Sequence, residues 1–226
     1  MKIEWLRQSD GASLIVFFNG WGMDATPLRP LTVDAHDVVV CSEYCHPFGG
    51  IEEIERIVVR YERRLLICWS MGVYFGQICF QSNPLVFDTT IAVNGTLTPI
   101  DDDNGIPVQT FQATLANLNT QSREKFYRRM CRPGGDFPLF TQNKPRRSIA
   151  SQHSELAFID EAATASAGGP GDSIYMNIVI AEGDLVIPAA NQHRFWGRQA
   201  TKTIQGPHFP FYSWQSWEGL VAGLSS

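Results

Sequence analysis

The stretch that most restricts the fold lies between residues 65 and 80, where one apolar run ends at a serine and another begins. Leu65 to Trp69 (LLICW) is a short continuous apolar run, which is typical of a strand buried on both faces of a parallel sheet. Gly72 to Phe80 (GVYFGQICF) has the pattern of an apolar helix. Ser70 is therefore predicted to lie at a strand-to-helix turn, which is the setting of a nucleophile elbow.

The residues around this serine fit the elbow pattern G-x-S-x-G with one departure. Gly72 occupies the second glycine position, but Cys68 stands at the first. Small residues are needed there because the tight turn brings them against neighbouring backbone, while the serine takes strained dihedral angles. A plainer interpretation is that Ser70 only caps the helix N-terminus, a role that serine often fills.

The rest of the chain alternates between strand and helix patterns. A helical spacing of apolar residues covers 51–61, and further helical patterns follow Ser70, Pro188 and Ser213. This alternation predicts an α/β fold with a doubly wound, mostly parallel sheet. Strands are expected at 14–18, 37–41, 65–69, 90–94, 176–181 and 200–205.

One long stretch interrupts the alternation. Residues from about 96 to 173 contain helical patterns without a convincing buried strand. An insertion at this place in the strand order is where a lid over an active site is expected. Its exit is a glycine-rich segment at 167–171, expected to be a flexible loop. The whole chain, 1–226, has the length of a single domain carrying this lid insertion.

A base and an acid for the serine follow from position. Among the five histidines, only His208 comes just after the last predicted strand, where a loop can bring an imidazole to the Ser70 hydroxyl. Asp184 follows the preceding strand and can orient that imidazole, although an aspartate there can also serve only as a turn residue. Glu182 and the cluster 101–103 are alternatives. The order Ser70, Asp184, His208 is that of the α/β-hydrolase fold.

Acyl transfer also needs backbone N–H groups that stabilise the developing oxyanion. Met71 offers one such amide at the N-terminus of its helix. The loop Asn19-Gly20-Trp21-Gly22 after the first predicted strand offers the other, and its glycines favour the Trp21 amide as the donor. The Trp21 indole is expected either to line the substrate pocket or to be a core residue.

Several of these segments together resemble a known family. FFNGWGMD, ICWSMG, VNGTLTPI followed by GIP, and GPHFPF look like the pimeloyl-acyl-carrier-protein methyl ester esterases of the BioG type, over most of the chain. The resemblance implies hydrolysis of the methyl ester of pimeloyl-acyl-carrier protein in biotin synthesis. It also implies that Ser70, Asp184 and His208 form the triad and that Trp21 and Met71 supply the oxyanion donors.

The charge distribution bears on the partner. The net charge of −5 argues against a nucleic-acid binder as a whole, yet eight basic residues stand against two acidic ones between residues 121 and 147. A basic lid would dock an acidic acyl-carrier protein, although a solvated helix face is the plainer interpretation. The basic residues are Arg123, Lys125, Arg128, Arg129, Arg132, Lys144, Arg146 and Arg147, of which Arg128, Arg129 and Arg132 are the candidates for carrier binding.

Aromatic residues could line the channel for the acyl chain, or could belong to the core. The candidates are Phe111, Phe126, Phe137, Phe140 and Phe209, with Phe126 and Phe209 foremost.

Other sequence features suggest a cytoplasmic enzyme without a cofactor. The N-terminus has no apolar signal region, and no apolar run reaches the roughly 20 residues of a membrane span. Five cysteines without regular spacing fit reduced thiols. Cys41, Cys45 and His46 form only a weak metal-binding pattern, and the expected chemistry requires no metal.

The sequence leaves three alternatives open. The same site could serve a general short-chain carboxylesterase or an acyl thioesterase, since the triad does not specify the leaving group. The chain could also be a noncatalytic binding module for a ligand or an acyl-carrier protein. Lastly, the basic lid could bind RNA or a membrane surface, which predicts a steep dependence on salt.

Overall fold

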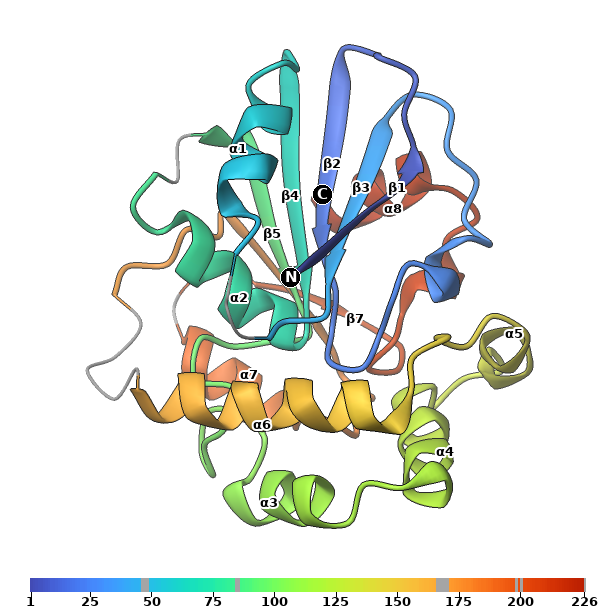
Figure 1. Ribbon diagram of the computed structural model, residues 1–226, viewed down its shortest axis with the longest axis vertical. Helices are drawn as coiled ribbons and strands as arrows, with labels where there is room; N and C mark the ends of the chain where they lie inside the picture. The colour runs from blue at the N-terminus through green and yellow to red at the C-terminus, as the bar shows by residue number, and fades with distance from the viewer. Residues whose placement is uncertain (46–48, 84–85, 166–170, 198, 200, 226) are drawn as a thin grey trace.

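The protein contains a seven-stranded sheet flanked by helices (Figure 1). The computed structural model describes residues 1–45, 49–83, 86–165, 171–197, 199 and 201–225. The strand order is β1-β3-β2-β4-β5-β6-β7, and every pair is parallel except β1 with β3. The predicted α/β class with a mostly parallel sheet is therefore confirmed.

The six strands expected from apolar runs and β-prone segments are all present, with small shifts at their ends. Strands β2 and β3 are buried at every position, because they lie in the interior of the sheet with both faces covered. Met176 precedes β6 and is exposed, and position 200 lies outside the described residues. The strands are β2 (Ser13–Phe18), β3 (Asp37–Ser42), β4 (Arg63–Trp69), β5 (Thr89–Val93), β6 (Asn177–Ala181) and β7 (Thr201–Ile204).

The first strand, β1 (Lys2–Arg7), was not predicted. It pairs antiparallel with β3 at the edge of the sheet, with Ile3 opposite Cys41 and Trp5 opposite Val39. Its side chains are only half-buried, so it lacks the continuous apolar run of the inner strands. The alternation of Ile3 and Trp5 with charged residues is the period-two signal that identifies such a strand.

Three helices outside the insertion begin where predicted, and the last one begins slightly later, at Trp217 rather than directly after Ser213. They are α1 (Ile51–Val58), α2 (Met71–Phe80), α7 (Ala189–Trp196) and α8 (Trp217–Ser225), with short 3-10 turns η1 (Thr26–Leu28) and η3 (Phe211–Ser213). In Figure 1, α1 and α2 lie in front of the sheet and α8 lies behind it, as a doubly wound sheet requires. Helix α1 ends at Val58, three residues before the predicted end.

Residues 96–173, named the insertion below, join β5 to β6. Their described part holds α3 (Val108–Ala116), α4 (Thr120–Met130), α5 (Phe137–Gln142) and α6 (Ile149–Ala165), and no strand of the sheet. Figure 1 shows α6 crossing the carboxyl ends of the strands, with α3 and α4 beyond it. Most of the predicted exit loop at 167–171 lies outside the described residues.

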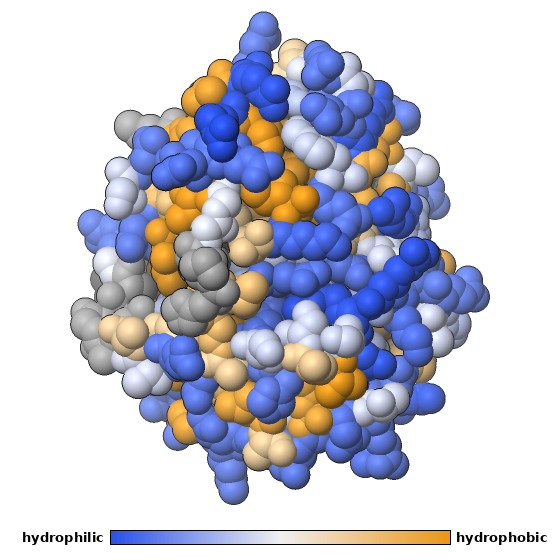
Figure 2. Space-filling model, viewed as in Figure 1, coloured by the Kyte–Doolittle hydropathy of each residue, from blue (hydrophilic) through white to orange (hydrophobic). Residues whose placement is uncertain are grey.

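The surface of the same view is mixed. Hydrophilic residues cover much of it, and apolar residues gather both in its upper half and in its lower part (Figure 2). Within the described ranges, no helix combines the length and the apolar character needed to cross a membrane.

Candidate active site

Ser70 lies at the tight turn between β4 and α2. Its backbone has φ 57° and ψ −124°, a conformation that non-glycine residues rarely adopt. The turn is closed against the first strand of the parallel core: a Cβ on Gly72 would lie 2.2 Å from the Phe18 carbonyl oxygen. Only glycine fits at position 72, as the elbow pattern predicts.

The departure at Cys68 has a structural explanation. Its side chain is fully buried between β4 and α2. A Cβ on Gly76 would lie 2.5 Å from the Cys68 sulfur, so the missing side chain at 76 provides the room for the thiol. The larger residue at the first elbow position is therefore accommodated by Gly76 of α2, one helical turn after Gly72.

Three predicted site residues form one chain of hydrogen bonds. His208 Nε2 lies 2.9 Å from Ser70 Oγ, and His208 Nδ1 lies 2.7 Å from Asp184 Oδ2. All three side chains are buried. Ser70 stands at the N-cap position of α2, but its side chain makes no capping hydrogen bond. Its hydroxyl is directed to the imidazole instead.

Asp184 uses its two oxygens for different tasks. Oδ1 accepts hydrogen bonds from the Val186 and Ile187 amides, which is the turn role that the sequence also allowed. Oδ2 accepts from His208 and from Gln192 Nε2 at 2.9 Å. The turn fixes the carboxylate in place, and Gln192 of α7 helps to orient it. Nothing in the sequence distinguishes Gln192 from other polar helix residues.

The backbone of His208 is held from two strands. Its carbonyl oxygen accepts hydrogen bonds from Trp69 Nε1 at 2.7 Å and from Asn94 Nδ2 at 2.9 Å. Asn94 Oδ1 also accepts from the Ala181 amide at 2.7 Å, so this buried side chain joins the ends of β5 and β6 to the histidine loop. Sequence reasoning missed Asn94, although the Asn-Gly pair after β5 marks a residue with positive φ.

The alternative acids lie elsewhere. Glu182 is exposed and contacts His193 at 2.9 Å. Asp101 accepts hydrogen bonds from the amides of residues 103 and 104 within its own turn. Neither group contacts His208, whose imidazole is paired with Asp184.

Two backbone amides near Ser70 are left without an acceptor. Gly20 donates its amide to Asn19 Oδ1, and Gly22 donates to Glu155 Oε2. Between them, the Trp21 amide has no acceptor within the described part of the chain, and neither does the Met71 amide at the start of α2. These are the two donors that the sequence suggested for an oxyanion.

A pocket of about 490 Å³, measured with its opening to solvent, lies over Ser70 and His208. Its walls are mainly apolar, as is usual for a small-molecule site. The Trp21 indole forms part of the wall and donates to the Gln152 carbonyl at 2.8 Å. The other lining residues are Trp69, Met71, Ile106, Thr110, Phe111, Thr114, Phe126, Arg129, Leu156 and Val186.

A groove between α3 and α4 adjoins this pocket. It is lined by residues of both helices and shares Thr110, Thr114, Phe126 and Arg129 with the pocket. The insertion thus both covers Ser70 and forms a hollow that leads away from it.

The aromatic candidates separate into two groups. Phe111 and Phe126 line the pocket. Phe209 is not among the lining residues: it is buried and packs edge-on against Trp69 and Phe140, as a core residue does. Phe140 belongs to the same core, and Phe137 lies under the Arg128 guanidinium.

The basic residues do not form one surface. Arg128 and Arg132 are exposed, whereas Arg129 lines the pocket and the groove. Arg147 is buried in an ion pair with Glu155. Charges that are close in sequence therefore differ in exposure, and Arg128 and Arg132 are the exposed ones among the three carrier-binding candidates.

The cysteines differ in their exposure to solvent. Cys41 is buried and Cys45 exposed, while His46 lies outside the described residues. No cluster of potential metal ligands is found among the residues with described positions. Burial raises the pKa of the Cys79 and Cys131 thiols to about 12.

Comparison with known proteins places this chain in a family. The family model described as "Pimeloyl-ACP methyl esterase BioG" matches residues 1–220. An uncharacterised protein of Haemophilus influenzae is 32% identical over 213 residues, which are 93% of this chain and 94% of that protein. A malonyl-acyl-carrier-protein O-methyltransferase of Bacteroides fragilis is 32% identical over 197 residues, 86% of this chain, and the match spans only 39% of that relative.

Solved structures agree. The crystal structure of BioG from Haemophilus influenzae superposes with a TM-score of 0.82 at 29% identity, covering 97% of this chain and 99% of that chain. A hydrolase from Pseudomonas aeruginosa has a TM-score of 0.63 at 14% identity, with 99% and 98% coverage, and shares the fold. By its family match and its α/β-hydrolase architecture, the chain belongs to the BioG family of pimeloyl-ACP methyl esterases.

Proposed function

We propose that this protein is a serine esterase that removes the methyl group from pimeloyl-acyl-carrier-protein methyl ester in biotin synthesis. The observation that carries the proposal is the hydrogen-bonded chain from Asp184 through His208 to Ser70, set under an apolar pocket. Family membership supports the substrate and the pathway. The mechanism follows from the positions of the atoms.

In the first step, Ser70 Oγ attacks the ester carbonyl as His208 Nε2 takes its proton. Asp184 holds the imidazole by Nδ1 and stabilises the imidazolium. The carbonyl oxygen becomes an oxyanion, for which the Trp21 and Met71 amides are the donors. Collapse of the tetrahedral intermediate breaks the bond to methoxide, which leaves as methanol with the proton from His208.

In the second step, water attacks the acyl-serine ester while His208 takes one of its protons. The second tetrahedral intermediate releases Ser70, which regains a proton from His208. The product is a free carboxylate at the distal end of the acyl chain, with the thioester to the carrier intact. No metal or organic cofactor enters this sequence.

An acyl-carrier protein holds its acyl chain on a long phosphopantetheine arm, and this arm requires a path to Ser70. The groove between α3 and α4 adjoins the pocket and provides that path in this proposal. Exposed Arg128 and Arg132 on or just after α4 lie on the outer side of the insertion and fit an acidic carrier. Arg129 lines both the pocket and the groove, and in this proposal it contacts the bound arm or the acyl chain.

The Bacteroides fragilis relative adds a chemical link. It is named for transferring a methyl group to an acyl chain on a carrier protein, and removal of such a group is the reaction proposed here. The reaction expected to supply the substrate is therefore O-methylation of a carrier-bound acyl carboxylate, followed by chain elongation.

The test is incubation of the protein and of a Ser70→Ala variant with methyl-pimeloyl-acyl-carrier protein, followed by intact mass of the carrier. Loss of the methyl group with the thioester retained, only in the wild type, is the expected result. Release of free carrier would instead indicate a thioesterase. Hydrolysis of simple short-chain esters but not of the carrier-bound ester would indicate a general carboxylesterase. An unchanged carrier, together with no fluorophosphonate labelling of Ser70, would indicate a binding module.

A further inference from the structure

Residues 19–22, named the oxyanion loop below, contact helix α6 of the insertion through two consecutive residues, Trp21 and Gly22. Gln152 Nε2 donates to the Gly22 carbonyl at 2.8 Å, and Glu155 Oε2 accepts from the Gly22 amide at 2.9 Å. One position earlier, Trp21 Nε1 donates to the Gln152 carbonyl at 2.8 Å. Residues about 130 positions apart in sequence are thus joined by three buried hydrogen bonds within one turn of α6.

These bonds surround the one loop amide that is free. The amides of Gly20 and Gly22 are both occupied, and both polar backbone groups of Gly22 are held by α6. The direction of the Trp21 amide is set by the peptide units on either side of it. Glu155 and Gln152 therefore fix the donor that the proposed reaction uses, without touching the substrate.

Glycine at 22 makes the contact possible. Its φ is +76°, in the left-handed region, and a Cβ there would lie 3.2 Å from Gln152 Nε2. Gln152 is itself buried and also donates to Tyr127 Oη of α4 at 2.8 Å. The amide group is therefore oriented by two acceptors.

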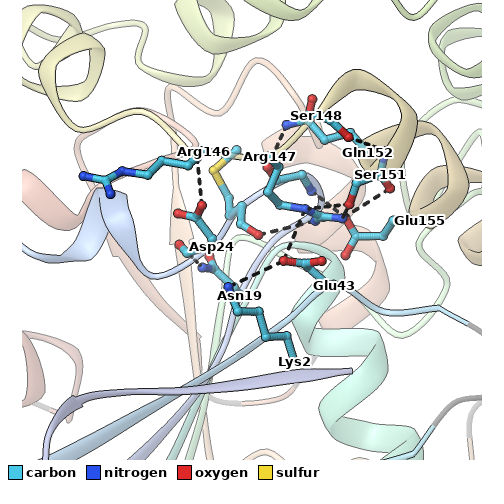
Figure 3. A network of polar contacts seen from close by, with 12 residues as sticks. Lys2, Asn19, Asp24, Glu43, Arg146, Arg147, Ser148, Ser151, Gln152 and Glu155 are labelled. Atoms are coloured by element: carbon cyan, nitrogen blue, oxygen red, sulfur yellow. Dashed lines mark hydrogen bonds and ion pairs between the residues drawn. The ribbon is translucent and has the colours of Figure 1, made fainter.

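The Glu155 carboxylate, like the Gln152 amide, is held by several hydrogen bonds. It is buried, and its Oε1 accepts from the Tyr44 amide at 2.9 Å while Arg147 Nη1 donates to Oε2. Figure 3 shows Arg147 reaching between Glu155, Glu43 and Ser151. Ser151 Oγ accepts from Arg147 Nη2 at 2.7 Å. A buried carboxylate is costly unless it is paired and fully hydrogen-bonded, and here the guanidinium and two amides satisfy it.

We propose that Gln152 and Glu155, with Arg147 as the counter-ion, are positioning residues that hold the Trp21 amide in the oxyanion hole. The inference rests on the proposed function, because it concerns the same site. A loop fixed from the insertion keeps its donor in place before the reaction, which is the condition for strong electrostatic stabilisation of a transition state.

The test compares Gln152→Met and Glu155→Gln with the wild type on a p-nitrophenyl ester. Loss of one oxyanion donor costs about 100-fold or more in kcat, so partial misplacement is expected to lower kcat by about 10- to 100-fold, with KM nearly unchanged. Affinity for a trifluoromethyl ketone, which forms an oxyanion on Ser70, is expected to fall by a similar factor.

Thr90→Val provides the matched control. Thr90 is buried and bonds the Ile174 carbonyl at 2.6 Å, at the end of β5 away from Ser70, so its variant loses buried hydrogen bonds without touching the loop. Its kcat is expected to stay near the wild-type value even though its Tm falls. Variants at 152 and 155 that lower Tm but keep the wild-type kcat and inhibitor affinity would overturn the proposal.

Two further measurements separate the outcomes. Arg147→Met/Glu155→Met removes both buried charges together, so folding is expected to survive even where Glu155→Gln deprives Arg147 of its buried carboxylate partner. An unchanged kcat in this folded double variant would also overturn the proposal. Fluorophosphonate labelling of wild-type Ser70 is measured first: its absence would refute the proposed function, whereas labelled wild type with fully active variants refutes the positioning role alone.

Discussion

At the scale of single residues, the elbow depends on where side chains are missing. Gly72 lies against the Phe18 carbonyl, and Gly76 leaves the space that Cys68 fills. The strained backbone of Ser70 is maintained by this close packing between β4, α2 and β2.

The Gly72→Ala variant tests this packing. Its Cβ would lie 2.2 Å from a backbone oxygen that cannot move without displacing β2, so we expect a loss of about 2–3 kcal/mol in unfolding free energy, together with lost Ser70 labelling. Urea unfolding followed by tryptophan fluorescence measures the first quantity. Gly135→Ala is the control, because a Cβ there meets nothing within 4 Å. Equal stability of the two variants would contradict the packing argument.

At the scale of elements, β3 begins with a buried carboxylate that organises the loop before β2. Burial raises the pKa of Asp37, but hydrogen bonds from Ser9, Tyr61 and Gly11 outweigh it and leave the pKa below its ordinary value. A depressed pKa in the folded state contributes stability above the unfolded pKa, and that contribution is lost as the pH falls through the folded value.

Asp37→Asn is therefore expected to lower the urea midpoint at pH 7, and the difference from wild type is expected to narrow as the pH falls below about 4. Urea titrations at a series of pH values check this. Asp34→Asn, which removes an exposed carboxylate nearby, is expected to change little at any pH. A difference between Asp37→Asn and wild type that does not depend on pH would refute the linkage.

The groove between α3 and α4 gives a second prediction at this scale. Ala113→Trp places a large side chain in the groove but not in the pocket over Ser70. We expect kcat/KM for the carrier-bound ester to fall by at least about tenfold, or about 1.4 kcal/mol of transition-state binding, with p-nitrophenyl acetate turnover unchanged. Ala116→Trp, exposed on the same helix outside the groove, is the control. Equal losses for both esters would show that the arm does not pass here.

Some elements and site residues could be predicted from the sequence, and others could not. Inner strands such as β2 and the turn at Ser70 could be predicted, because continuous apolar runs and local turn chemistry are encoded within a few residues. Asn94 and Gln192 could not, because their partners lie on other strands and helices. The sequence also left the place of Phe209 open, because an aromatic residue beside a histidine can face either the pocket or the core, and only packing decides.

At the scale of the whole molecule, the interior protects most of the thiols. All five cysteines are free, and only Cys45 is exposed. Burial raises the pKa of Cys41, Cys68, Cys79 and Cys131, which keeps them as unreactive thiols.

Iodoacetamide is therefore expected to add one group to the native protein and five after denaturation, as measured by intact mass. A Cys45→Ser variant is expected to take up none in the native state. Rapid uptake of more than one group by the native wild type would mean that the core opens on the timescale of labelling.

The contacts of α6 with Gly22 and Trp21 limit which parts of the insertion can be exchanged between related enzymes. An insertion that only covered its site could be swapped between homologues as a module. Here, recombination that replaced α6 would remove the hydrogen bonds that hold the loop at Trp21 and Gly22, whereas α3 and α4 contribute walls of the pocket and the groove. Exchange of α3 and α4 on a retained α6 is thus the route by which this scaffold can acquire new acyl substrates without rebuilding its reaction centre.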